Sequence, residues 1–199
     1  MSKIDYDLVI IGAGPAGLTA GMYAARARMN VLLLEKAVPG GQILVTDWIE
    51  NYPGFPEGIS GFDLAEKMKI QAQEMGLEIE TAEVHSLNLS KELKEIVLKD
   101  RSVFAKSLII ASGASPKNLG IGEDKFIGKG VSFCATCDAP FFKDKTVVAI
   151  GGGDTAVQEA IYLTKFAKKV YLIHRRDELR AAKILQERAF ENNKIEIVW

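Results

Sequence analysis

One architecture occurs twice in this chain of 199 residues, and it restricts the possible folds more than any other feature. In the first copy a short apolar run ends at Gly12, a helix-forming segment follows, and a second apolar run ends at Glu35. In the second copy the corresponding positions are Gly151 and His174, with the same separation of 23 residues. Each copy has the pattern of a β-α-β unit with buried parallel strands. We therefore predict an α/β protein of two Rossmann-like units (three-layer ββα/βαβ), with a boundary near residues 112–118.

Apolar runs, helical periodicity and glycine or proline punctuation predict the other elements. Strands are expected at 7–12, 30–35, 106–113, 145–151, 169–173 and 195–199, and helices at 15–29, 61–75, 154–168 and 177–190. The stretch 38–56 is expected to be loop. Residues 78–106 are expected to form small antiparallel strands, with a solvated hairpin around 91–94.

The first copy carries a dinucleotide-binding fingerprint. Gly12-Ala-Gly-Pro-Ala-Gly17 matches G-x-G-x-x-G directly after a predicted strand and at the start of a predicted helix. The first glycine permits a tight turn, the second lets the backbone approach a pyrophosphate, and the third lets helix and strand pack closely. The helix N-terminus favours phosphate groups, and Glu35 can accept hydrogen bonds from a ribose. The alternative is a structural turn with Glu35 as a solvated charge.

The second copy differs at the position that discriminates between nucleotides. Gly151-Gly-Gly-Asp-Thr-Ala156 matches G-x-G-x-x-A in the same context, but His174-Arg-Arg176 stands where the first copy has Glu35, and Arg180 follows. Arginines bind a 2′-phosphate through charge-assisted, often bidentate hydrogen bonds, whereas a carboxylate would repel it. The second unit is therefore expected to prefer NADP(H). The alternative is an exposed basic helix start, which the helix dipole disfavours.

The two cysteines of the chain, Cys134 and Cys137, have C-x-x-C spacing and are followed by Asp138. A closed zinc site needs four ligands, and the two histidines are poor candidates to complete one, so no metal is expected. Two inert buried thiols are a second interpretation. The third is a disulfide that is reduced and re-formed, since this spacing at a helix start favours thiol exchange. With two nucleotide sites the chain then suggests an electron relay from nicotinamide through flavin to a disulfide.

The composition mainly excludes classes of partner and targeting segments. Lys and Arg total 25 and Asp and Glu total 26, so no broad electrostatic case for nucleic acid or membrane binding exists. The apolar run near the N-terminus is too short for a signal peptide, and no segment approaches a membrane span. A cytoplasmic protein is expected, in agreement with the low cysteine count.

Several short motifs in order make a resemblance specific. They are Gly12-Ala-Gly-Pro-Ala-Gly17, Gly40-Gly-Gln42, Asn51-Tyr-Pro-Gly54, Cys134-Ala-Thr-Cys-Asp138, Gly151-Gly-Gly-Asp-Thr-Ala156 and His174-Arg-Arg176. Across essentially the whole chain the sequence resembles the low-molecular-weight (bacterial-type) thioredoxin reductase family. The C-A-T-C-D segment just before the second nucleotide fold is the most telling, because glutathione-reductase-like enzymes carry their cysteines in the first domain.

The resemblance implies a flavoprotein disulfide reductase in which residues 1–114 bind FAD and residues 115–199 bind NADPH and carry the redox cysteines. Its substrate would be the disulfide of thioredoxin or a similar dithiol protein, and the family is homodimeric. Cys137 would be the flavin-proximal thiol, Cys134 the thiol that attacks thioredoxin, and Asp138 the acid–base residue. The expected cofactor-binding residues are Gly12, Gly14, Pro15, Ala16, Gly17, Glu35, Lys36, Gly40, Gly41, Gln42, Asn51 and Gly113 in the first unit, and Gly151, Gly153, Asp154, Thr155, Ala156, His174, Arg175, Arg176 and Arg180 in the second.

One departure from the family pattern concerns the C-terminal side. In the family the chain returns to the FAD domain with a Gly-Asp motif, which does not follow residue 154 here. The sequence is therefore expected to lack roughly the C-terminal third of a reductase, which leaves the second domain and the FAD site incomplete. Two further interpretations stay open: a flavin reductase of another dithiol protein (peroxiredoxin-system or glutaredoxin-like), or a catalytically silent nucleotide-binding fragment.

Overall fold

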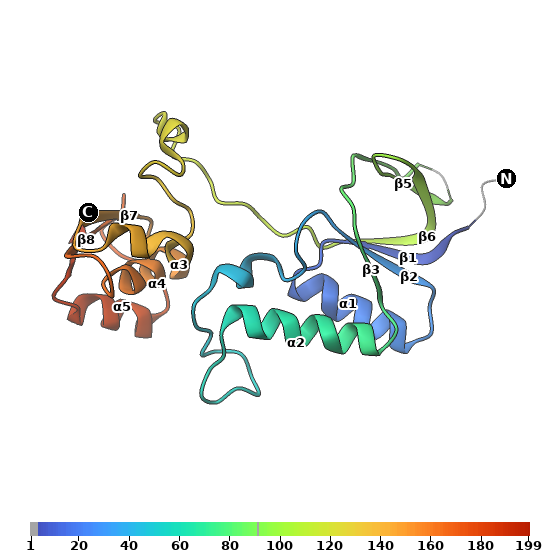
Figure 1. Ribbon diagram of the computed structural model, residues 1–199, viewed down its shortest axis with the longest axis horizontal. Helices are drawn as coiled ribbons and strands as arrows, with labels where there is room; N and C mark the ends of the chain where they lie inside the picture. Colours follow the sequence, from blue (N-terminus) through green and yellow to red (C-terminus); the bar gives the residue numbers. More distant parts are fainter. Residues whose placement is uncertain (1–3, 91) are drawn as a thin grey trace. The chain divides into compact units, whose positions relative to one another are not determined.

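The computed structural model describes residues 4–90 and 92–199. The chain forms two compact units, one ending at Ser115 and the other running from Pro116 to Trp199 (Figure 1). Each unit has its own sheet, its own covering helices and its own hydrophobic core. Both sheets contain adjacent parallel strands, as expected for Rossmann-type nucleotide-binding units.

The first unit contains a six-stranded sheet in the order β3-β2-β1-β6-β5-β4. Strands β3, β2, β1 and β6 run parallel to one another, whereas β5 is antiparallel to both β6 and β4. The bounds are β1 Tyr6–Ile11, β2 Val31–Glu35, β3 Glu78–Thr81, β4 Ser86–Asn88, β5 Lys94–Val97 and β6 Ser102–Ile110. β1 lies at the centre because its residues are apolar on both faces: Val9 and Ile10 have no exposed surface.

Helices α1 (Pro15–Arg26) and α2 (Gly61–Glu74) lie side by side against one face of this sheet (Figure 1). Leu8, Ile10 and Leu33 point into the core below α1 and α2. Val9 and Leu32 point to the opposite face, where residues of β5 and β6 cover them. The unit therefore has a ββα arrangement of layers, which leaves the carboxyl ends of β1 and β2 open for the glycine-rich turn.

The second unit contains a parallel sheet in the order β7-β8-β9. The strands are β7 Thr146–Ile150, β8 Lys169–Ile173 and β9 Ile195–Val198, and the helices are α3 Ala135–Asp138, α4 Asp154–Leu163 and α5 Lys183–Glu191. Val157 and Ala160 of α4 pack against Val170 and Leu172 of β8, and all four are fully buried. This core fixes α4 directly behind the second glycine-rich turn.

Three sequence predictions need correction. Residues 78–81 form β3, a parallel partner of β2 and not part of an antiparallel group, because α2 crosses over and returns the chain in the same direction. The stretch 38–56 contains a short 3₁₀ helix, η1 (Gly41–Val45). Helix α5 begins at Lys183, not near residue 177, because hydrogen bonds hold the preceding residues against the second fingerprint.

A fourth prediction also needs correction: helix α4 ends at Leu163, and tight turns replace the expected helix to residue 168. The expected hairpin around 91–94 is seen as the antiparallel pair of β4 and β5, and residue 91 lies outside the described residues. No helix within the described part of the chain has the length and apolar character that crossing a bilayer requires.

Candidate functional site

The first fingerprint forms the turn between β1 and α1. The N–H of Gly12 donates to the carbonyl of Leu34 on the neighbouring strand at 2.8 Å, and Gly12 has a φ of +100°. A Cβ at Gly12 would lie 2.4 Å from the backbone oxygen of Ala111. Glycine is thus required here both by the backbone conformation and by space.

The middle glycines of the two fingerprints, Gly14 and Gly153, are not required by the backbone conformation or by space. Gly14 has φ −72° and ψ −179°, and Gly153 has φ −91° and ψ 177°, which are extended conformations open to any residue. A Cβ at Gly153 would meet no protein atom within 4 Å, and one at Gly14 would meet only the Cα of Gly41, at 3.9 Å. Neither the fold nor the packing demands glycine at these positions. A pyrophosphate that approached the main chain would be a reason for glycine at both positions, and this stays a prediction.

Other predicted residues of the first unit converge on this turn. The N–H of Gly40 donates to the carbonyl of Ala13 at 2.8 Å. The carboxylate of Glu35 accepts hydrogen bonds from the N–H groups of Ala13 at 2.8 Å and of Ala37 at 3.1 Å. Glu35 thereby lies at the end of β2 beside the fingerprint, where a ribose would bind. Pro15 and Ala16 form the first turn of α1.

The remaining predicted residues of the first unit lie on η1, which contains Gly41 and Gln42, and on loops. The side-chain amide of Gln42 donates to the carbonyl of Ala114, which is adjacent to the exposed Gly113. Lys36 follows β2 and is exposed. Asn51 is also exposed, and within the described ranges no hydrogen bond joins it to the fingerprint. The role of these residues in binding FAD stays a prediction.

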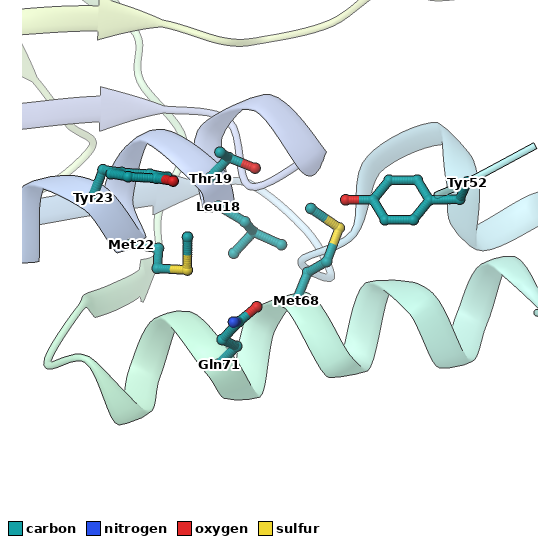
Figure 2. Close-up of a pocket in the computed structure, with 7 residues that line it drawn as sticks. All are labelled: Leu18, Thr19, Met22, Tyr23, Tyr52, Met68 and Gln71. Atoms are coloured by element: carbon teal, nitrogen blue, oxygen red, sulfur yellow. The ribbon is translucent and has the colours of Figure 1, made fainter. Parts of the chain in front are cut away.

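A pocket of about 220 Å³ lies between α1, α2 and the loop that carries Tyr52 (Figure 2). Figure 2 shows Leu18, Met22 and Met68 between the two helices, and the ring of Tyr52 pointing toward Met68 from the loop. Thr19, Tyr23 and Gln71 complete the lining. None of the seven lining residues belongs to the predicted cofactor set.

The second fingerprint repeats the first at the turn between β7 and α4. The N–H of Gly151 donates to the carbonyl of Ile173 at 3.0 Å, and Gly151 has a φ of +144°. Asp154 and Thr155 begin α4, and both are exposed. Ala156 stands where the first copy has Gly17, so the helix in this unit accommodates a methyl group at the close approach.

His174 is buried behind this turn, with a relative exposure of 6%. Its ring packs so closely that a Cβ added to Gly152 would lie 2.6 Å from three ring atoms. Within the described part of the chain its Nε2 has no hydrogen-bond partner. A buried nitrogen without a hydrogen-bond partner is costly, and a contact of His174 with a nucleotide stays a prediction.

The predicted arginines follow β8 and are exposed. Arg175 and Arg176 come directly after His174, and no ion pair involves either side chain in residues 4–90 and 92–199. The backbone N–H of Arg180 donates to the carbonyl of Gly152 at 2.7 Å. The fold thus brings the arginine-bearing segment onto the fingerprint, as a site for a phosphorylated ribose requires.

Cys134 and Cys137 form a disulfide, with Cα atoms 5.4 Å apart. Cys134 is the N-cap of α3 and is half-buried, whereas Cys137 is exposed. The N–H of Cys137 donates to Sγ of Cys134 at 3.2 Å, and the hydroxyl of Thr136 lies 3.3 Å from the same sulfur. These donors would stabilise a thiolate on Cys134 after reduction.

Three contacts around the disulfide and the second fingerprint have no motif in the sequence. The backbone of Cys134 is held by two hydrogen bonds with the hydroxyl of Ser132. On α4, Glu159 accepts a long hydrogen bond, 3.4 Å, from the N–H of Ala135, and burial raises the pKa of its carboxyl above the ordinary value. Gly152 takes part through its carbonyl and through His174, although only its neighbours were predicted. Only long-range packing reveals these roles.

No cluster of three or more His, Cys, Asp or Glu that could hold a metal ion occurs in the part of the chain that the structure describes.

Gly17 gives a direct test of the first turn. A Cβ at Gly17 would lie 1.8 Å from the oxygen of Gly12 and 3.0 Å from its carbonyl carbon. Because both are backbone atoms, α1 would have to move off β1, and we expect Gly17→Ala to lower the free energy of unfolding by about 3 kcal/mol. Urea unfolding followed by circular dichroism measures this loss.

Gly14→Ala is the matched control, since it adds the same methyl group three residues earlier. With an ordinary backbone conformation and open space at Gly14, its unfolding free energy should stay within about 1 kcal/mol of the parent. If both variants lose the same stability, the close contact between α1 and the turn is not what requires glycine at position 17.

Comparison with known proteins agrees with this geometry. Residues 6–199 match the pyridine nucleotide-disulphide oxidoreductase family. A thioredoxin reductase of Peptoclostridium acidaminophilum is 50% identical over 195 residues, which are 98% of this chain and 62% of that protein. The thioredoxin reductase of Bacillus subtilis is 48% identical, with 98% of this chain and 61% of that protein covered.

The chain is also similar to solved structures of thioredoxin reductases. A crystal structure of Lactococcus lactis thioredoxin reductase is 48% identical with a TM-score of 0.95, and it matches 98% of this chain and 64% of that one. A crystal structure of T. acidophilum thioredoxin reductase is 36% identical with a TM-score of 0.90, again with 98% of this chain and 64% of that one covered. The chain thus spans about 62% of the length of the curated relatives that it matches.

Proposed function

Because the chain belongs to the pyridine nucleotide-disulphide oxidoreductase family, we propose that it is the FAD- and NADPH-binding part of a reductase that reduces the disulfide of thioredoxin. The observation that carries the proposal is the Cys134–Cys137 disulfide in the same unit as the second fingerprint and the arginines after β8. Relatives named thioredoxin reductase, similar over 98% of the chain, support the choice of substrate.

The two fingerprints fit dinucleotides. Gly14 and Gly153 leave room at the main chain that the protein itself does not use. In the first unit the carboxylate of Glu35 lies beside the turn and suits a ribose, so we assign FAD there together with the loops around Gly41, Gln42 and Asn51. In the second unit we assign NADPH, with its 2′-phosphate held by Arg175, Arg176 and Arg180 and with His174 as a further polar contact. The nicotinamide and the flavin supply two-electron transfer when bound.

The cysteines perform the exchange with the protein substrate. The Cys134 thiolate attacks one sulfur of the thioredoxin disulfide, which forms a mixed disulfide and releases one thiol. The Cys137 thiolate then attacks Sγ of Cys134, which re-forms the Cys134–Cys137 disulfide and releases the second thiol of thioredoxin. Two electrons pass in this sequence, and each released thiolate takes up one proton. Asp138, at the end of α3, is assigned the role of holding and transferring the proton.

The assembly and the compartment follow from the same proposal. We infer a homodimer in the cytoplasm, because the family pattern is dimeric and a dithiol relay works where thiols are kept reduced. Nucleic acid and membrane partners are not proposed, since the net charge of −1 gives no basis for either.

A visible spectrum tests the proposal. Purified protein incubated with FAD should show flavin absorption that NADPH bleaches and oxidised thioredoxin restores. A chain that stays colourless with excess FAD contradicts the FAD assignment. A flavin that NADPH bleaches but thioredoxin does not reoxidise contradicts the assignment of thioredoxin as substrate.

A further inference from the structure

We propose that Asp154 is a positioning residue whose carboxylate fixes the Arg180 loop against the second fingerprint, and that this contact strengthens the selection of nucleotides with a 2′-phosphate. The inference rests on the proposed NADPH site. It assigns to Asp154 a role on the protein itself, in place of a contact with the nucleotide.

In the loop from 177 to 182, the residues from Leu179 onward alternate between core and solvent. Leu179 and Ala181 are each 5% exposed and belong to the core of the second unit. Arg180 lies between them and is exposed. The alternation resembles that of a strand, so anchoring the neighbours on both sides directs Arg180 outward.

Three consecutive backbone N–H groups of this loop donate hydrogen bonds to residues of the second fingerprint. Those of Arg180 and Ala181 both donate to the carbonyl of Gly152, at 2.7 and 3.0 Å. That of Ala182 donates to Oδ1 of Asp154 at 2.7 Å. Asp154 is the first residue of α4, directly after Gly153, so its side chain joins the loop to the turn where the pyrophosphate would bind.

The opposite edge of the loop is held independently. The side-chain amide of Gln186 on α5 donates to the carbonyls of Leu179 at 3.2 Å and Ala181 at 2.7 Å. Without Asp154 the loop would keep this support and the Gly152 contacts, but its end at Ala182 would lose its link to α4. The expected effect is therefore on placement of Arg180, not on the existence of the fold.

The negative charge of Asp154 also needs a reason. A carboxylate close to a bound phosphate would weaken binding by repulsion, so an aspartate at the start of α4, next to Gly153 of the fingerprint, needs a compensating reason. The short hydrogen bond to Ala182 provides one, and the first turn of α4 also favours a negative charge. If the hydrogen bond is what matters, an asparagine at this position serves as well.

The test is calorimetric titration of the chain with 2′,5′-ADP and with 5′-AMP, which differ by the 2′-phosphate. The measured quantity is the ratio of the two dissociation constants. Asp154→Ala should reduce the preference for 2′,5′-ADP about three- to tenfold, the range for one lost hydrogen bond, while binding of 5′-AMP changes less than twofold. Asp154→Asn, which keeps an acceptor oxygen, should retain the parental ratio within about twofold.

A double-mutant cycle separates positioning from general loosening of the unit. In an Arg180→Ala background, Asp154→Ala should not change the ratio further, because its effect acts through Arg180. An undiminished preference in Asp154→Ala overturns the inference, and so does an equal effect in the Arg180→Ala background. A parent chain that does not distinguish the two nucleotides overturns the proposed NADPH site itself, and the inference with it.

Discussion

The Cys137→Ser variant, reduced with dithiothreitol and then mixed with oxidised thioredoxin, is expected to accumulate a mixed disulfide through Cys134. The backbone N–H of residue 137 and the hydroxyl of Thr136 lie within hydrogen-bond distance of Cys134 Sγ and would stabilise its thiolate, and without the Cys137 thiol nothing resolves the intermediate. NADPH-dependent reduction of thioredoxin should fall by on the order of 10³-fold or more, because neither cysteine alone completes the exchange. Non-reducing electrophoresis and mass spectrometry detect the adduct.

Cys134→Ser is the matched variant. It should lose the same activity and yet form no stable adduct with thioredoxin, since the remaining thiol is not the one that attacks. The trapping step needs neither flavin nor nicotinamide, so it tests the dithiol separately from the cofactor sites. An adduct with Cys134→Ser and none with Cys137→Ser would reverse the roles of the two cysteines.

The second large effect concerns the arginines after β8. The double variant Arg175→Ala/Arg176→Ala should weaken NADPH binding by about 100-fold or more, because each charge-assisted hydrogen bond to phosphate contributes about 1.5–3 kcal/mol. NADH binding should change little, since NADH lacks the 2′-phosphate. Fluorescence titration with both nucleotides measures the difference.

Lys168→Ala controls for the loss of positive charge. Lys168 is exposed and precedes β8, whereas the arginines follow the other end of that strand. It should leave NADPH binding within about twofold at physiological salt. Equal weakening of NADPH and NADH by the arginine double variant would show that these side chains support the fold or the pyrophosphate, not the 2′-phosphate.

Much of the fold is readable from the sequence where burial is complete. The strand at 169–173 has the predicted bounds, and β1 and β2 lie within one residue of theirs, because parallel strands covered on both faces are continuous apolar runs. β3 shows the limit. Its sequence, Glu-Ile-Glu-Thr, alternates in the same way whether the strand pairs parallel or antiparallel, and only the crossover of α2 decides.

The loop before α5 shows a second limit. Residues 177–182 have a helix-forming composition, but the N–H groups of Arg180, Ala181 and Ala182 bond to Gly152 and Asp154. Tertiary hydrogen bonds therefore override local propensity. The candidate site likewise has residues that the sequence predicts and contacts that it does not predict. Glycines, cysteines and arginines belong to motifs whose spacing is local. The contact of Glu159 with Ala135 joins residues far apart in sequence, and no sequence pattern predicts it.

The hydrogen bonds that join the Arg180 loop to the second fingerprint come from the main chain of the loop. Its exposed side chains, unlike the buried Leu179 and Ala181, can therefore vary without loss of these bonds. A lineage could exchange arginines for other residues at 175, 176 and 180, and so move from one nicotinamide nucleotide to the other, while the scaffold that presents them stays intact. Cofactor preference in this unit is in that sense an evolvable trait, separate from the inheritance of the fold.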